Sequence, residues 1–164
     1  MKRIMLALVA ATAVAVATAA PAAAEERTCR GSIGAQTVDN LRVPQGATCA
    51  LNGTFVKGTV KVERGATLEA RNIRVVGNIQ AENHKQVNVR GSRVGGSVQI
   101  KQGGGSSLNN NVVTGDVQYF TNRGTITIRS NRINGNLQCK ENRPAPTGGG
   151  NIVQGNKEDQ CKRL

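Results

Sequence analysis

The chain has 164 residues and a formal net charge of +12, with 20 glycines and 2% aromatic residues. This length fits one small domain, and the excess of basic residues favours anionic partners. The scarcity of aromatic rings argues against nucleic acid as the partner, since proteins that bind single strands usually stack bases on such rings.

Residues 1–24 predict a secretory signal peptide. Lys2 and Arg3 precede an apolar run over residues 4–20, and Pro21 and small residues follow before Glu25. This order is typical of an export signal, cleaved here before Glu25. The alternative is a retained membrane anchor, but the run is shorter than the roughly 20 residues that a spanning helix needs. We therefore expect a secreted or cell-envelope protein of residues 25–164, without a membrane span after cleavage.

The exported product is strongly basic. Removing Lys2 and Arg3 from the 22 basic residues leaves 20 against 10 acidic residues, which is a formal charge of +10.

A repeat with a period of one short turn fills residues 52–160. One glycine marks each copy, at Gly58, Gly77, Gly96, Gly115, Gly135 and Gly155, so the successive steps are 19 or 20 positions. A repeat this short is one turn of a solenoid. Residues 38–43 align one period before Gly58, although this earlier copy lacks the glycine. We therefore place the repeating turns, or rungs, at residues 38–160 and treat the first rung as irregular. We expect the glycines to mark sharp corners of the backbone.

Hydrophobic positions around each glycine predict three short strands per turn. A β-branched residue stands two positions before each glycine. One pair of mainly apolar residues stands two and four positions after the glycine, and a second pair stands nine and seven positions before it. This alternation puts both side chains of a pair on one strand face. Stacked turns then enclose one interior, with parallel strands about 4.8 Å apart. The predicted fold is all-β, a right-handed parallel β-helix of six to seven rungs, the hand following the general bias of parallel crossovers.

The four cysteines predict two disulfides that hold the ends of the coil. Cys29 and Cys49 are 20 residues apart, and Cys139 and Cys161 are 22 apart. About one turn separates each pair, so the partners lie in neighbouring strands at a distance that a disulfide accepts, and export favours oxidation. The competing interpretation is a metal site, but there is no C-x-x-C motif and only one histidine, so we expect no metal.

The last turn is predicted to stop the stack. Lys157 and Asp159 take positions that are apolar in earlier turns, and Pro144 and Pro146 fall where a strand would run. Charges and prolines on an edge strand hinder pairing with a second molecule. We therefore expect a monomer.

Two kinds of surface column follow from the stacking. A glutamine stands three positions after four successive glycines, at Gln80, Gln99, Gln118 and Gln138. We interpret them as a structural amide ladder, with recognition of polar sugars as the alternative.

Arginines form the second kind of column, six and three positions before the glycine. They are Arg71, Arg74, Arg90, Arg93, Arg129 and Arg132, interrupted by Asn109 and Val112. Arginines stacked about 5 Å apart repel one another unless they splay or meet an anion, which suggests a polyanion-binding stripe. The alternative is that their stems only cover apolar surface.

Catalytic chemistry has little support in the sequence. The acidic residues are scattered; Glu63 and Glu82 are the one pair that the repeat brings close, whereas glycoside hydrolysis needs two carboxylates at a set separation. His84 lies in the loop over residues 81–85, where we expect it to be exposed, and no nucleophile motif accompanies it. We predict no catalytic or cofactor site.

The C-terminal sequence NLQCKENRPAPTGGGN, continued by GNKEDQC up to Cys161, resembles a set of small secreted proteins of actinobacteria. The resemblance covers most of the exported chain and implies export and a β-helix, without a particular activity. The stacked pattern is also similar in style to bactofilins, which are polymerising cytoskeletal β-helices. The export signal, the cysteines and the charged last turn depart from bactofilins.

The functional prediction is a non-catalytic exported protein whose arginines bind an anionic polymer of the cell envelope or the extracellular space. A polysaccharide lyase or hydrolase and a self-assembling surface protein are the alternatives.

Overall fold

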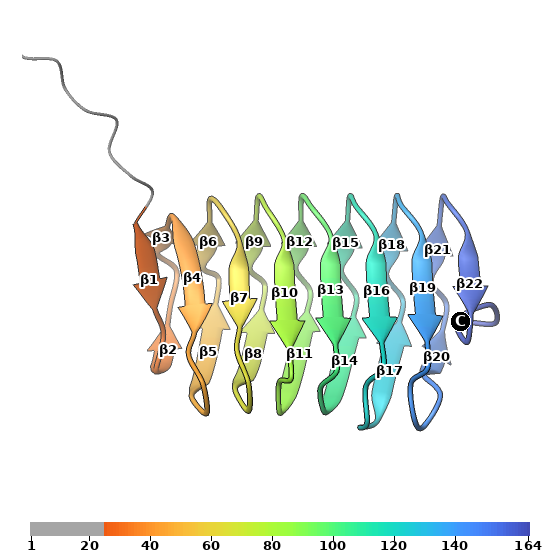
Figure 1. Ribbon diagram of the computed structural model, residues 1–164. Helices are drawn as coiled ribbons and strands as arrows, with labels where there is room; N and C mark the ends of the chain where they lie inside the picture. Colours follow the sequence, from red (N-terminus) through yellow and green to blue (C-terminus); the bar gives the residue numbers. More distant parts are fainter. Residues whose placement is uncertain (1–24) are drawn as a thin grey trace, which may run out of the picture.

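The computed structural model describes residues 25–164, so the predicted signal peptide lies outside the described residues. Residues 25–164 form a coil of short parallel strands, three to a turn (Figure 1). They contain no helix, and therefore none long and apolar enough to cross a membrane.

The strands build three parallel sheets, which we call A, B and C in the order in which the chain visits them. Sheet A consists of β1 (Glu26–Thr28), β4 (Asn40–Val43), β7 (Val60–Val62), β10 (Ile79–Glu82), β13 (Val98–Lys101), β16 (Val117–Phe120), β19 (Leu137–Lys140) and β22 (Lys157–Asp159). Sheet B consists of β2 (Gly31–Ile33), β5 (Thr48–Asn52), β8 (Thr67–Arg71), β11 (Gln86–Arg90), β14 (Gly105–Asn109), β17 (Ile126–Arg129) and β20 (Thr147–Gly149). Sheet C consists of β3 (Thr37–Val38), β6 (Phe55–Val56), β9 (Arg74–Val75), β12 (Arg93–Val94), β15 (Val112–Val113), β18 (Arg132–Ile133) and β21 (Ile152–Val153).

The coil is right-handed. In Figure 1 the strands of sheet A run downward in front, and the chain returns upward behind them while it advances toward the C-terminus. The predicted right-handed parallel β-helix is confirmed, with about seven turns.

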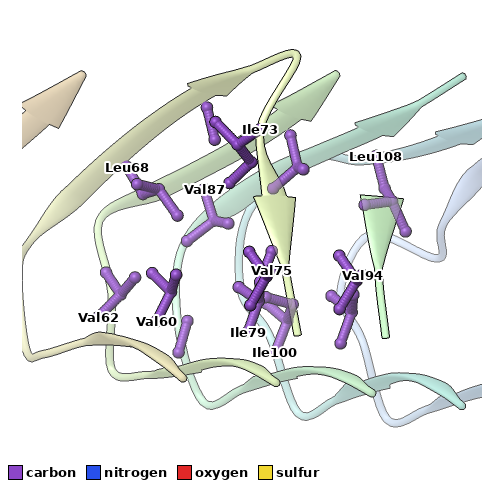
Figure 2. Packing of buried hydrophobic residues seen from close by; sticks show 14 of the residues in the cluster. Val60, Val62, Leu68, Ile73, Val75, Ile79, Val87, Val94, Ile100 and Leu108 are labelled. Atoms are coloured by element: carbon purple, nitrogen blue, oxygen red, sulfur yellow. The ribbon is translucent and has the colours of Figure 1, made fainter. Parts of the chain in front are cut away.

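Aliphatic side chains from all three sheets fill the interior (Figure 2). Leu68, Val75 and Ile79, one from each sheet, are at most 1% exposed, as the alternation predicts. Burying each such side chain stabilises the fold by about 1.5 to 3 kcal/mol. Tyr119 is also fully buried, and its hydroxyl lies 3.0 Å from the Ser106 hydroxyl, so the phenol has a hydrogen-bonding partner inside the coil.

The coil begins one turn earlier than the sequence predicts. Strands β1, β2 and β3 pair with β4, β5 and β6, so the first rung starts at Glu26 and not at Val38. Glu26 pairs with Asn40, whereas Leu41 pairs with Val60, so fewer residues make up the first turn than the second. The shorter first turn therefore does not match the period of the later ones.

The repeated glycines lie at bends, as predicted, at the corner between sheets C and A. Their φ angles are not in the left-handed region, which is occupied by residues at the other two corners, for example Asn72 between sheets B and C and Asn83 between sheets A and B. A Cβ atom on Gly77 would lie 2.7 Å from the carbonyl oxygen of Gly58 in the turn before. The glycines are required because the turns stack closely there.

Both predicted disulfides are present. The Cα atoms of Cys29 and Cys49 are 5.6 Å apart, and those of Cys139 and Cys161 are 5.3 Å apart. Each closes a loop of about one turn, which stabilises the protein by about 3 kcal/mol when the native geometry is relaxed. They fasten the first and the last turn, which have a neighbour on only one side.

The C-terminal turn agrees with the prediction in part. Lys157 and Asp159 pair in register with Leu137 and Cys139, so charged residues do continue two interior columns. The prolines were placed wrongly, since Pro144 and Pro146 precede β20 and leave its residues free of proline. The charges at this end, and not the prolines, oppose addition of a strand.

Candidate anion-binding surface

The structure brings the six predicted arginines to one edge of the coil, the corner between sheets B and C. One row lies at the ends of the sheet B strands, where Arg90 pairs with Arg71 on one side and Asn109 on the other, followed by Arg129. The second row lies at the starts of the sheet C strands, in the register order Arg74, Arg93, Val112 and Arg132. Neighbours in each row are about 4.8 Å apart along the axis.

All six arginine side chains are exposed because each occupies an outward position of its strand. In β8, for example, Ala70 faces the interior and Arg71 faces solvent. The ion pairs formed by residues 25–164 join Arg42 to Glu26 and Glu63, and Lys57 to Asp39. The six arginines therefore have no carboxylate partner in the described part of the chain, and their mutual repulsion is relieved only by solvent or by an added anion.

Two shallow hollows lie between Arg71 and Arg90. One, of about 280 Å³, is at the corner itself and is also lined by Asn72, Gly91 and Asn110. The other, of about 220 Å³, is on sheet B. The pair of guanidinium groups thus borders concave surface on both sides.

Two neighbouring groups, an aromatic ring and a carboxylate, partly offset the positive charge of this edge. The guanidinium carbon of Arg74 lies 5.3 Å from the centre of the Phe55 ring, so this arginine also covers apolar surface. Glu69 lines the 220 Å³ hollow beside Arg71 and Arg90, and its carboxylate accepts a hydrogen bond from Asn88 at 2.7 Å. The hollow at the corner, unlike the one on sheet B, has no carboxylate in its lining.

The four glutamines form a hydrogen-bonded row on the outside of sheet A. Gln80 donates to Gln99 at 3.1 Å, Gln99 to Gln118 at 3.2 Å, and Gln118 to Gln138 at 2.8 Å. Gln138 in turn donates to the carboxylate of Glu158 at 2.9 Å. We call this row the amide ladder.

Two further ladders, made of buried asparagines, are absent from the sequence predictions. One lies at the corner between sheets B and C and contains Asn111, Asn131 and Asn151; the other lies between sheets A and B and contains Asn122 and Asn142. Each side-chain oxygen accepts the backbone N–H of the residue one turn earlier. The signal in the sequence was asparagine recurring once per turn, although a single asparagine is more typical of an exposed loop.

The column of Asp116 serves the third corner, between sheets C and A. Its carboxylate accepts the backbone N–H of Asn136 at 2.7 Å, and Asp116 donates its own N–H to Ser97. Asp116 stands beside Gly115 in a column of short polar residues typical of turns, and these two hydrogen bonds give it a structural role.

His84 corrects the expectation of an exposed loop histidine. Its side chain is buried, with 3% exposed, and neither ring nitrogen has a hydrogen-bonding partner among residues 25–164. A Cβ on Gly103, one turn later, would overlap the imidazole ring, so the ring fills the space that this glycine leaves. Burial lowers the pKa of His84 to about 4, because the cationic form would lose its hydration.

The burial of His84 predicts a loss of stability in mild acid. Between pH 6.5 and pH 4 the unfolded chain binds a proton at His84 that the folded protein does not, so the free energy of unfolding falls as the pH falls. The full difference is about 3 kcal/mol. Urea unfolding at pH 7 and at pH 4.5 should register about 2 kcal/mol of this difference, and His84→Leu should lose less stability between these two pH values. Equal losses in both proteins would contradict it.

The acidic pair that the repeat brings close lies on sheet A. Glu63 and Glu82 line one hollow on sheet A, but Glu63 is engaged by Arg42 at 3.5 Å and by the backbone N–H of Gln45 at 3.1 Å. Among residues 25–164 no group of three or more histidine, cysteine or acidic side chains has the arrangement of a metal site. The charged groups that remain without a partner are mainly cations.

Comparison of the chain with family models, curated proteins and solved structures finds no match. The resemblance of the C-terminal sequence to secreted actinobacterial proteins therefore stays a prediction.

Proposed function

We propose that this protein is exported and, without catalysing a reaction, binds an anionic polymer of the cell envelope or the extracellular space along the corner between sheets B and C. The observation that carries the proposal is the double row of six exposed arginines, none of which has a carboxylate partner within residues 25–164. A polymer with regularly spaced anionic groups relieves the repulsion along both rows at once.

Rigidity supports binding to a polymer over binding to a small anion. The arginines stand on strands whose register is fixed by backbone pairing and, from Asn111 onward, also by the buried asparagines at the corner. Because the backbone that carries the arginines is already fixed, it does not have to be ordered when an extended polymer binds. The entropic cost of association is therefore lower. The two disulfides are consistent with an oxidising, extracellular environment.

The gap at Asn109 and Val112 divides the rows into two groups. Arg71, Arg74, Arg90 and Arg93 stand on two adjacent turns, and Arg129 and Arg132 lie two turns further on. The first four arginines form the denser group, so we assign the main share of binding to them.

The test uses the oxidised protein of residues 25–164 and long-chain polyphosphate as the probe. Replacing Arg71, Arg74, Arg90 and Arg93 by serine should weaken binding more than tenfold at low salt. If each arginine contacts one phosphate, the slope of log K against log salt should fall by roughly 3, at about 0.7 per contact with a flexible single strand. Titration calorimetry at several salt concentrations measures both quantities.

A matched variant removes the same charge elsewhere on the coil. Arg123, Lys140, Arg143 and Lys162 are also exposed, and their replacement by serine should leave most of the affinity and the slope intact. If both variants weaken binding equally, the protein attracts polyanions only through its net charge, and the proposed surface is wrong.

A further inference from the structure

The hollow lined by Glu63 and Glu82 lies on the outer surface of sheet A, which does not include the arginine corner. Its volume is about 370 Å³, and it lies over the head of the amide ladder, with Gln80 and Gln99 on one side and Glu82 on the other. Lys61 and Arg64 border it on the turn before. This size is within the range of small-ligand sites in proteins.

The hydrogen bonds of the ladder run in one direction only, and Glu158 sets that direction. An ionised carboxylate accepts and does not donate, so Gln138 must turn its NH₂ group toward Glu158. Its oxygen then faces Gln118, and the same orientation passes along the row to Gln80. The side-chain oxygen of Gln80 is therefore the unpaired acceptor at the head of the ladder, in the hollow.

This acceptor is strengthened by the row behind it. Each donated hydrogen bond polarises the amide that donates it, and four such bonds connect Gln80 to a carboxylate. Each glutamine NH₂ group also has a second hydrogen that the ladder does not use. Successive turns thus present a free donor, with a free acceptor at the head, at intervals of about 4.8 Å.

Charged groups of both signs border this floor without pairing to each other. Glu82 is beside Lys101 in register, yet the Lys101 ammonium lies 5.8 Å from the centre of the Phe120 ring and forms no ion pair with Glu82. Lys61 and Arg64 are exposed, and neither belongs to an ion pair formed within residues 25–164. Lys61 and Arg64 thus stand at one end of the hollow, and the Glu82 carboxylate, which forms no ion pair within residues 25–164, lies along one side. Lys101 and Glu63, which is paired with Arg42, complete the charged lining.

We propose that this hollow binds an oligosaccharide that carries carboxylates, that is, a chain containing uronic acid residues. Sugar hydroxyls donate and accept at once, which suits a floor of amide N–H groups, the Gln80 oxygen and Glu82. Lys61 and Arg64 bind a sugar carboxylate through charge-assisted hydrogen bonds. Adjacent rungs are separated by about the length of one pyranose ring in an extended chain, so neighbouring sugars meet neighbouring glutamines.

The experiment is an NMR titration of the ¹⁵N-labelled protein of residues 25–164 with a trimer of galacturonic acid. The side-chain NH₂ signals of Gln80 and Gln99 should shift progressively, while that of Gln138, which is outside the hollow, stays in place. A neutral trimer of galactose should cause the same shifts only at roughly tenfold or higher concentration, because it lacks the carboxylate contacts.

Two variants separate this site from the arginine corner. Replacing Lys61 and Arg64 by serine should weaken binding of the acidic trimer by roughly tenfold or more. Replacing the four arginines of the corner should leave the shifts of Gln80 and Gln99 unchanged. The proposal is overturned if the acidic trimer at millimolar concentration leaves the signals of Gln80 and Gln99 in place. It is also overturned if the shifts of these two signals disappear only in the variant without the four corner arginines. Neither result bears on polyphosphate binding at the corner.

Discussion

Gly96→Ala should destabilise the protein by about 3 kcal/mol, near the upper end of what overpacking usually costs. An added Cβ would lie 2.8 Å from the carbonyl oxygen of Gly77 on the preceding turn, and it would also collide with the side-chain oxygen of Asn78. That oxygen accepts the backbone N–H of Ser97 at 2.8 Å. The two turns must therefore separate locally or give up a corner hydrogen bond. Urea unfolding at pH 7 measures the loss as a lower midpoint.

Gly34→Ala is the matched control. Gly34 also lies in a turn, but a Cβ there would have no atom within 4 Å, and its φ is outside the left-handed region. Its replacement should change the free energy of unfolding by no more than about 0.5 kcal/mol. If Gly96→Ala unfolds at the same urea concentration as this control, close stacking is not the reason for the glycine column.

The period of the chain was sufficient to predict which residues share a column. A step of one period places Val56 beneath Val75, Arg71 beneath Arg90, and Gln80 beneath Gln99, and the strand register has all three pairs. This works because each turn contacts only its neighbours, so one-dimensional spacing becomes three-dimensional position. The fold, the disulfides and the arginine rows all follow from that single regularity.

The period does not reveal what fills a corner. Four residues occupy equivalent places at successive turns between sheets A and B, yet they are of three different chemical types: His84, Gly103, Asn122 and Asn142. A buried ring at one turn permits only glycine at the next, and asparagines take over where they can accept a backbone N–H. Such compensation between neighbouring turns depends on packing, so single residues were misjudged there.

The largest expected effect of a single substitution is that of Asn131→Ala. The side chain of Asn131 takes part in four buried hydrogen bonds: it accepts from the backbone and side-chain nitrogens of Asn111 at 3.0 and 3.1 Å, and donates to Leu108 and Asn151 at 2.7 and 2.9 Å. Alanine leaves the backbone N–H of Asn111 buried without a partner, and it removes the side-chain hydrogen bonds to Leu108 and Asn151. At about 1 to 3 kcal/mol for the unsatisfied N–H and about 1 kcal/mol for each of the two other hydrogen bonds, the loss should be about 4 kcal/mol.

Two variants determine whether the hydrogen bonds are responsible for that loss. Asn131→Asp keeps the acceptor for Asn111 but replaces the donor to Leu108 by an oxygen, and it buries a charge. This variant should therefore also be strongly destabilised at pH 7. It should recover part of its stability in acid, because the carboxyl group becomes protonated. Asn134→Ala, at an exposed position on the same turn, should unfold like the unmodified protein. Free energies from urea unfolding rank the three. If Asn131→Ala is no less stable than Asn134→Ala, the buried ladder does not hold the corner, and the rigid spacing that we assign to Arg129 and Arg132 must come from the backbone pairing alone.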